Sequence, residues 1–402
     1  MLSRRKSLSL VGAVALSAAL PVRVAVAAPP TDRRLVVIIL RGGLDGLAAV
    51  VPYGDPSYSV QRTSLAFEPP GADEGPLDLD GFFGLHPSLE TMHALYRQKE
   101  LIVFHAVATP YRRRSHFDAQ DLLENGTATP SGARSGWLNR ALSLYGHRET
   151  SLGLAIGTTV PLILRGDAAV GAFAPRRLAQ AGDDFLSRMS ALYQTDALLG
   201  PVFAEAVRAQ EMNDEILGRI RDGKGKRVRR AESLPAVARD VGKLLRHPGG
   251  ARIAVLDIGG WDTHANQGVL TGRLARSLKG LDDGVAALKE TLSSVWEKTA
   301  ILVMSEFGRT VRPNGTNGTD HGIAGVAMLA GGGLAGGRLI ADWPGLSAER
   351  LHEGRDLSPT MDLRAVTKAV AIDHLGLTAR EVEAWVFPNS GAVARIRDLF
   401  PF

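Results

Sequence analysis

Residues 252–264 read RIAVLDIGGWDTH and decide the fold class of this chain. The run from Ile253 to Leu256 is continuously apolar, which is typical of a strand buried on both faces of a sheet. Apolar residues then recur every three or four positions from Leu270 to Val295, the period of a helix that lays one stripe on a sheet. Because a second apolar run, Ile301 to Met304, follows that helix, the region predicts a crossover unit of an α/β protein.

Three more apolar runs extend the expected sheet toward both ends of the sequence. They are Leu35 to Leu40, Leu101 to Val107 and Val326 to Ala330, each bounded by turn residues. Together the five runs predict a mostly parallel central sheet covered by helices. The stretch at about 166–248 has a long helical periodicity and no convincing strand, so we expect a helical insertion or lid there.

The N-terminus has the pattern of a twin-arginine export signal. Arg4 and Arg5 precede an apolar run from Leu10 to Leu20, and a small-residue cleavage site ends at Ala27. The apolar run is shorter than the roughly 20 residues of a membrane-spanning helix, so we prefer cleavage to an anchor. The sequence therefore predicts a signal at 1–27, an α/β domain at 28–402, and a periplasmic or secreted protein with no membrane span after cleavage.

Composition limits the chemistry that the exported chain can perform. Residues 1–27 carry four basic and no acidic side chains, so the formal net charge falls from +5 to +1 without them, and we expect no nucleic acid partner. The chain has no cysteine, which excludes disulfides and thiolate metal sites. Any divalent metal must be held by Asp, Glu and His, which favours zinc, manganese, magnesium or calcium.

Polar residues collect just after the apolar runs, where ligands bind in an open α/β sheet. The candidate metal ligands are Asp45, Asp257, Asp262, His264, Glu306 and His321. The candidate catalytic residues are Ser115, Arg114 and His116. Carboxylates gathered at one edge repel one another, so a bound cation is the simplest way to stabilise them together. The cation would offset charge on an anionic ester, and a helix beginning at Ser115 would help to bind that anion.

Several of these residues also have a structural explanation. Ser115 and Asp118 have the spacing of a helix-capping pair, and Asp45 could simply shape a turn. Glu306 could pair with Arg309 at the surface. Five histidines outside the motifs are expected at the surface or in caps: His93, His147, His247, His352 and His374.

Five motifs in order resemble a known family. They are RGGLDGL (41–47), RSHFDAQD (114–121), GGWDTH (259–264), SEFGRT (305–310) and GTDHG (318–322). In this order they resemble the secreted bacterial family called domain of unknown function 1501, from about Leu35 to Phe387. The last two motifs, with DLSPT at 356–360, are also similar to the alkaline phosphatase and sulfatase superfamily. The resemblance implies an alkaline-phosphatase-like three-layer α/β sandwich.

The resemblance also implies roles for the candidate residues. Asp45 would match the first-strand metal carboxylate, Ser115 the nucleophile, and the segment from Asp257 to His264 the Asp and His of one metal. Glu306 and His321 would complete the ligands, while Phe307 stands where a paired histidine is expected, so we expect one metal or a rearranged pair.

Two functions remain open at this point. The first is an exported metal-dependent hydrolase of phosphate or sulfate esters that acts on a small anionic ester. The alternative is a periplasmic binding or assembly protein that keeps the fold without its chemistry and binds another secreted protein.

Overall fold

The computed structural model describes residues 31–72, 75–146, 152–174 and 233–401, together with residues 189, 192–193, 196, 203–204, 207 and 216–217. The expected signal at 1–27 and most of the expected insertion at 166–248 therefore lie outside the described residues. Within the described ranges, no helix combines the length and the apolar character required to cross a membrane.

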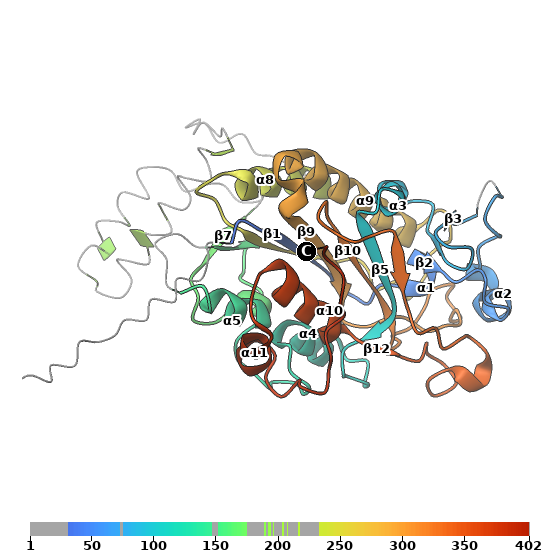
Figure 1. The fold of residues 1–402 in the computed structure, drawn as a ribbon. Coiled ribbons are helices and arrows are strands. Elements are labelled where there is room, and N and C mark those ends of the chain that lie inside the picture. The colour runs from blue at the N-terminus through green and yellow to red at the C-terminus, as the bar shows by residue number, and fades with distance from the viewer. Residues whose placement is uncertain are drawn as a thin grey trace, which may run out of the picture.

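One large sheet forms the centre of the molecule (Figure 1). Its strands are β1 (Arg34–Leu40), β5 (Leu101–Ala108), β6 (Gly153–Ile156), β7 (Val170–Phe173), β8 (Ile253–Ile258), β9 (Thr299–Ser305), β10 (Gly325–Ala330), β11 (Arg338–Ile340) and β12 (Met361–Asp362). They run in the order β11-β5-β10-β9-β1-β8-β6-β7, and β12 also pairs with β5. A small antiparallel sheet contains β2 (Val50–Val51), β4 (Gly84–Leu85) and β3 (Leu77–Asp78).

Helices cover both faces of the large sheet (Figure 1). One face carries α3 (Glu90–Arg97), α8 (Leu234–Arg246) and α9 (Arg273–Thr291). The other carries α4 (His116–Asn125), α5 (Trp137–Ser143), α10 (Leu363–Ala369) and α11 (Ala379–Glu381). The shorter helices are α1 (Gly46–Ala49) and α2 (Tyr58–Arg62), the 3-10 turns η1 (Thr63–Leu65), η2 (Leu162–Leu164), η3 (Ser293–Lys298) and η4 (Ala348–Arg350), and the π-helical segments η5 (Val370–His374) and η6 (Val382–Val386).

Strand β1 shows why the apolar runs have no polar alternation. Successive side chains of a strand point to opposite faces of the sheet. Val36, Ile38 and Leu40 belong to the core beneath α3, α8 and α9, whereas Leu35, Val37 and Ile39 belong to the core beneath α5 and α10. Both faces of the central strands are therefore buried, and the predicted three-layer α/β sandwich is confirmed.

All five predicted apolar runs are strands of a mostly parallel sheet, as predicted, and one expectation about the sheet is wrong. Strand β10 is antiparallel to both of its neighbours, because the chain returns from β9 through the loop 306–324 without a crossover helix. Strand β7 lies inside the stretch in which no strand was expected. Its four residues, VGAF, pair with β6 in parallel, and so short a segment carries little periodicity.

The outer side of β5 is paired in two pieces. Strand β11 pairs with residues Ile102 to Phe104, and β12 pairs with Val107 and Ala108. Between the two pieces the backbone of Ala106 takes a left-handed φ of 55°, and the register with β10 shifts at Gly325 and Val326. The strand therefore carries a bulge at its middle.

His374 is buried, so the expectation that it lies at the surface or in a cap is wrong. The residue is only 2 % exposed. Its Nε2 donates a hydrogen bond to the carbonyl of Arg34, 2.8 Å away. The ring stacks on Phe400 with a centroid separation of 5.1 Å. Burial lowers the pKa of His374 to about 4, with the carbonyl of Arg34 opposing the shift.

We expect His374 to make the fold sensitive to acid. The unfolded chain, with a pKa of about 6.5, binds a proton first as the pH falls, so the folded state loses on the order of 3 kcal/mol between about pH 6.5 and pH 4. Urea unfolding at about pH 7 and about pH 5 should show a smaller loss in His374→Gln, which keeps a donor for Arg34 and does not titrate. As a control, Leu288→Ala in the core on the opposite face of the sheet should destabilise the chain similarly at both pH values. An unchanged pH dependence in His374→Gln would contradict the prediction.

Candidate metal centre

The carboxyl ends of β1, β8 and β9 meet at one edge of the sheet, because these strands are parallel and in register. Leu40 of β1 pairs with Ile258 of β8 and with Ser305 of β9. The segments that follow these strands therefore start side by side. The N-terminus of α4 and the loop before β10 contribute His116 and His321 to the same place.

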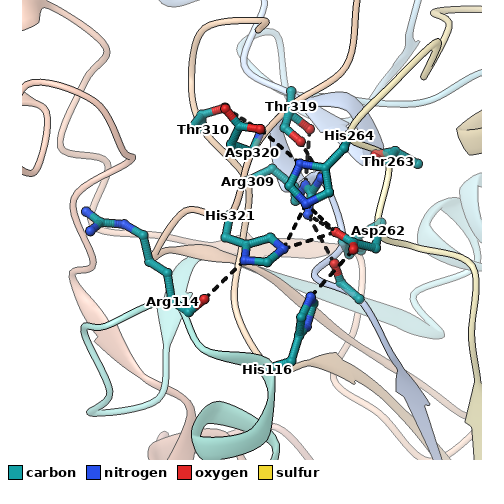
Figure 2. Close-up of polar contacts among 12 residues, drawn as sticks. Arg114, His116, Asp262, Thr263, His264, Arg309, Thr310, Thr319, Asp320 and His321 are labelled. Atoms are coloured by element: carbon teal, nitrogen blue, oxygen red, sulfur yellow. Dashed lines mark hydrogen bonds and ion pairs between the residues drawn. The ribbon is translucent and has the colours of Figure 1, made fainter. Parts of the chain in front are cut away.

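Three imidazoles meet the carboxylate of Asp262 (Figure 2). His264 Nε2 lies 3.0 Å and His321 Nε2 lies 3.1 Å from Asp262 Oδ1. The same two nitrogens are 3.0 Å apart, and His116 Nε2 lies 3.6 Å from Asp262 Oδ2. His116, Asp262 and His321 can each offer one ligand atom to a metal ion, with these atoms within 4.8 Å of one another.

The other ring nitrogen of each imidazole faces an oxygen that can only accept. His116 Nδ1 lies 2.9 Å from Glu306 Oε1, and His264 Nδ1 lies 2.9 Å from Asp320 Oδ1. His321 Nδ1 lies 3.1 Å from the carbonyl of Arg114. Each Nδ1 therefore carries the hydrogen, and the neutral ring has a lone pair on Nε2. This is the way in which proteins orient histidines that bind a metal.

The residues present fit a divalent cation. Asp262 Oδ1 already accepts from Arg309 Nη1, but the Nε2 lone pairs of the neutral His264 and His321 rings lie 3.0 Å apart, so they repel each other unless a proton or a cation lies between them. Nitrogen and oxygen ligands lie about 2 Å from zinc, which places tetrahedral neighbours about 3.3 Å apart. The spacing of His264, His321 and Asp262 is close to that value. The Asp262 and His264 side chains are 43 % exposed, so the site is open to solvent.

Two carboxylates of the site are held in the ionised form. Burial alone would raise the pKa of Asp262, but the hydrogen bond from Arg309 Nη1, 2.6 Å long, and the charge of Arg309 outweigh it and lower the pKa. Burial likewise opposes ionisation of Glu306, and hydrogen bonds from His116, Gln120 and the Gly42 amide lower its pKa. Negative charge is thus present at neutral pH for a cation to offset.

Phe307 packs against the site instead of binding metal. Its ring is buried, with centroids 4.9 Å from both His116 and His321. Its edge also closes on Gly43, where an added Cβ would meet the ring at 2.6 Å. The phenyl group therefore holds two imidazoles in place, and the space in which a further ligand was expected is apolar.

The structure brings together four of the six predicted ligands and separates two. Asp262, His264 and His321 are in contact, and Glu306 joins them through His116. Glu306 is 1 % exposed, so the alternative of a surface pair with Arg309 is wrong. His116, predicted to take part in catalysis, can offer a nitrogen within 4.8 Å of possible ligand atoms of Asp262 and His321.

Asp45 and Asp257 are engaged in other ion pairs. The carboxylate of Asp45 caps α1, accepts from Gln267, and lies 2.6 Å from Arg62 Nη2 in a pair with both side chains at most 1 % exposed. Asp257 binds Arg41, whose Nη2 lies 2.9 Å from Oδ2. Neither carboxylate contacts an imidazole within the described residues.

The segment Arg114–His116 has a different arrangement from the one expected. Ser115 is the N-cap residue of α4, but its hydroxyl makes no cap hydrogen bond, and Asp118 accepts from the Tyr111 hydroxyl at 2.7 Å. Hydroxyl and carboxylate therefore do not form the reciprocal capping pair. The guanidinium of Arg114 is paired with Asp356 and Glu353, and it is the carbonyl of Arg114 that enters the site.

Sequence reasoning missed Asp320 and the site role of Arg309. Asp320 orients His264, and it is itself held by Asn314 Nδ2 at 3.0 Å, which lowers its pKa together with the bond from His264. Both missed residues lie in the motifs named above. Asp320 is next to His321, and Arg309 is three positions after Glu306. A carboxylate adjacent to a ligand histidine was the available signal for an outer partner.

The chain belongs to the family described as "Protein of unknown function (DUF1501)", which residues 32–386 match. This confirms the predicted family. No curated protein matches the chain in sequence.

Several solved structures are weakly similar to the chain. A phosphonate monoester hydrolase of Agrobacterium radiobacter is 12 % identical, with 86 % of this chain and 74 % of that chain covered and a TM-score of 0.41. PsFucS1 sulfatase from Pseudoalteromonas sp. is 12 % identical, with 91 % and 71 % covered and a TM-score of 0.38. The C-terminal periplasmic domain of EcEptC from Escherichia coli, in complex with Zn, is 12 % identical, with 74 % and 73 % covered and a TM-score of 0.36.

The buried pair of Asp45 and Arg62 gives a test of whether Asp45 is structural. Asp45→Ala leaves a buried guanidinium without its counterion, so we expect urea unfolding to show a loss of about 3–5 kcal/mol. The double variant Asp45→Leu with Arg62→Leu should be closer to the wild type, because it leaves no unpaired charge. Cation binding by the folded fraction of Asp45→Ala should be unchanged, and its loss would restore Asp45 as a ligand.

Proposed function

We propose that this chain is an exported, metal-dependent hydrolase of phosphate or sulfate esters. One divalent cation would be held by His116, Asp262, His264 and His321, and Ser115 would be the nucleophile. A site with several imidazoles favours zinc or manganese over calcium, which prefers oxygen ligands. The export step, by the twin-arginine signal at 1–27 to the periplasm or beyond, rests on the sequence pattern.

The arrangement of the histidines around Asp262 carries the proposal. Three Nε2 atoms converge on one carboxylate while each Nδ1 is held by an acceptor from a separate part of the chain. If the three histidines only formed separate surface hydrogen bonds, there would be no reason for all three rings to carry the hydrogen on Nδ1. The matched orientation supports a common ligand for the three nitrogens.

The residues around the cluster suit an anionic ester. A cation there would offset charge on a phosphoryl or sulfuryl oxygen and lower the pKa of a bound hydroxyl. Ser115 immediately precedes α4, whose ten residues direct free backbone amides and the positive end of the helix dipole toward an anion. In the proposed reaction the Ser115 oxygen bonds to phosphorus or sulfur, the bond to the ester oxygen breaks, and the proton lost by the Ser115 hydroxyl ends on that oxygen, so the leaving group departs as the alcohol. Water then hydrolyses the Ser115 ester, which restores the hydroxyl and releases phosphate or sulfate.

Metal binding is the first test. We expect the purified mature chain to bind about one equivalent of zinc or manganese, measured by elemental analysis and calorimetric titration. His321→Ala and Asp262→Asn should each weaken binding by at least about tenfold, whereas His93→Ala, outside the cluster, should not. A wild-type chain that binds neither ion would contradict the proposal.

The role of Ser115 is tested by turnover. Ser115→Ala should lower hydrolysis of an aryl phosphate or an aryl sulfate by roughly a thousandfold or more, since it removes the attacking oxygen. The free energy of unfolding should change by about 1 kcal/mol or less, because the hydroxyl does not cap α4. Ser143→Ala in α5 is the matched control and should keep full turnover. Equal activity of the two variants would remove Ser115 from the mechanism.

A binding or assembly protein is the second candidate, and two contacts favour it. Phe307 fills a position at which a ligand was expected, and Arg309 Nη1 already lies 2.6 Å from Asp262 Oδ1. This candidate predicts a stable complex with another secreted protein and unchanged cellular function in a Ser115→Ala strain. Loss of function in that strain would exclude it.

A further inference from the structure

The backbone of Arg114 is held in a conformation that arginine rarely adopts. Its φ is 61°, in the left-handed region, which costs an L-residue with a Cβ roughly 1 kcal/mol or more. Such a conformation persists only where the surroundings determine it. Here the left-handed conformation directs the carbonyl oxygen of Arg114 toward His321 Nδ1, 3.1 Å away.

The side chain of Arg114 supplies the restraint. Nε lies 2.7 Å and Nη2 lies 2.6 Å from the same oxygen, Oδ2 of Asp356. Asp356 is 0 % exposed, whereas the second partner, Glu353, has a side chain that is 60 % exposed. Because an exposed ion pair contributes little and a buried charge-assisted pair fixes geometry, Asp356 is the effective partner.

Asp356 is itself attached to the loop that carries the site. Its backbone forms a bridge with Thr310, next to Arg309, and Arg309 forms a bridge with His321. Its second oxygen, Oδ1, is buried and accepts no hydrogen bond within the described residues. Burial raises the pKa of Asp356, and Arg114 opposes that shift. The only ion-pair partner of Oδ1 within the described residues is Arg355 Nη1, 3.6 Å away, so Arg114 supplies the hydrogen bonds that hold this buried carboxylate.

We infer that Asp356 and the guanidinium of Arg114 form a positioning pair for His321. The pair holds Arg114 in its left-handed conformation, so that its carbonyl accepts from His321 Nδ1 and the Nε2 lone pair faces Asp262 and His264. The inference deepens the proposed function, because a correctly oriented His321 is one of the proposed ligands. It assigns Arg114 a role through its main chain, in place of the direct catalytic role expected from its charge.

Asp356→Asn tests the inference with two measurements. The variant keeps the shape of the side chain but removes the charge that holds Arg114. Long-range ¹H–¹⁵N spectra of the metal-free chain should show His321 with hydrogen on Nδ1 in the wild type and a mixture of tautomers in the variant. Titration with zinc should show affinity reduced by about 10- to 100-fold.

Matched variants separate positioning from general stability. Glu353→Gln removes only the exposed ion pair of Arg114 and leaves its pair with Asp356. Both the His321 spectrum and the zinc affinity should therefore stay close to wild type. Arg114→Lys keeps the charge and the carbonyl but loses the planar guanidinium. It should therefore show the same changes in His321 tautomer and zinc affinity as Asp356→Asn, and it replaces that variant as the test if Asp356→Asn does not fold. An unchanged His321 tautomer in Asp356→Asn or Arg114→Lys, even with lowered stability, overturns the inference. If the wild type binds no zinc, the proposed function fails, while the spectra still decide the positioning role.

Discussion

The buried guanidinium of Arg309 is the interaction on which the site depends. It donates to the carbonyl of Gly42, to Asp262 Oδ1 and to both the hydroxyl and the carbonyl of Thr319. These partners follow β1, follow β8 and precede β10, so one fully buried side chain ties together loops that are distant in sequence. Since all five donors of a guanidinium lie in one plane, the three loops are also fixed in relative orientation.

That constraint explains how an open cluster can be well ordered. Asp262, His264 and His321 are each partly exposed, and exposed ion pairs alone contribute little to stability. Their order comes instead from buried neighbours. Arg309 fixes the carboxylate, Glu306 and Phe307 fix His116, and the ring of Phe307 also packs on His321. A rigid support with an accessible centre is the arrangement that binding of a small ligand requires.

The sequence was sufficient to predict the layers but not every partner within the site. The apolar runs predict β1, β5, β8, β9 and β10, because a strand buried on both faces needs no information beyond its own residues. Motif order along the chain also predicts that Asp262, His264 and His321 approach one another. Asp45 could not be separated from them, because its partner Arg62 stands in a segment without a motif and the pairing is tertiary. Likewise, nothing in the letters RRRSH indicates that Arg114 acts through its carbonyl.

The divided pairing on the outer side of β5 has a consequence for how the molecule behaves among its own copies. A long exposed strand offers a row of free amides and carbonyls onto which another chain can add. Here β11 and β12 occupy that row in two short pieces, and the bulge at Ala106 interrupts its straight course. This side of the sheet therefore offers no continuous template for fibril growth or domain exchange.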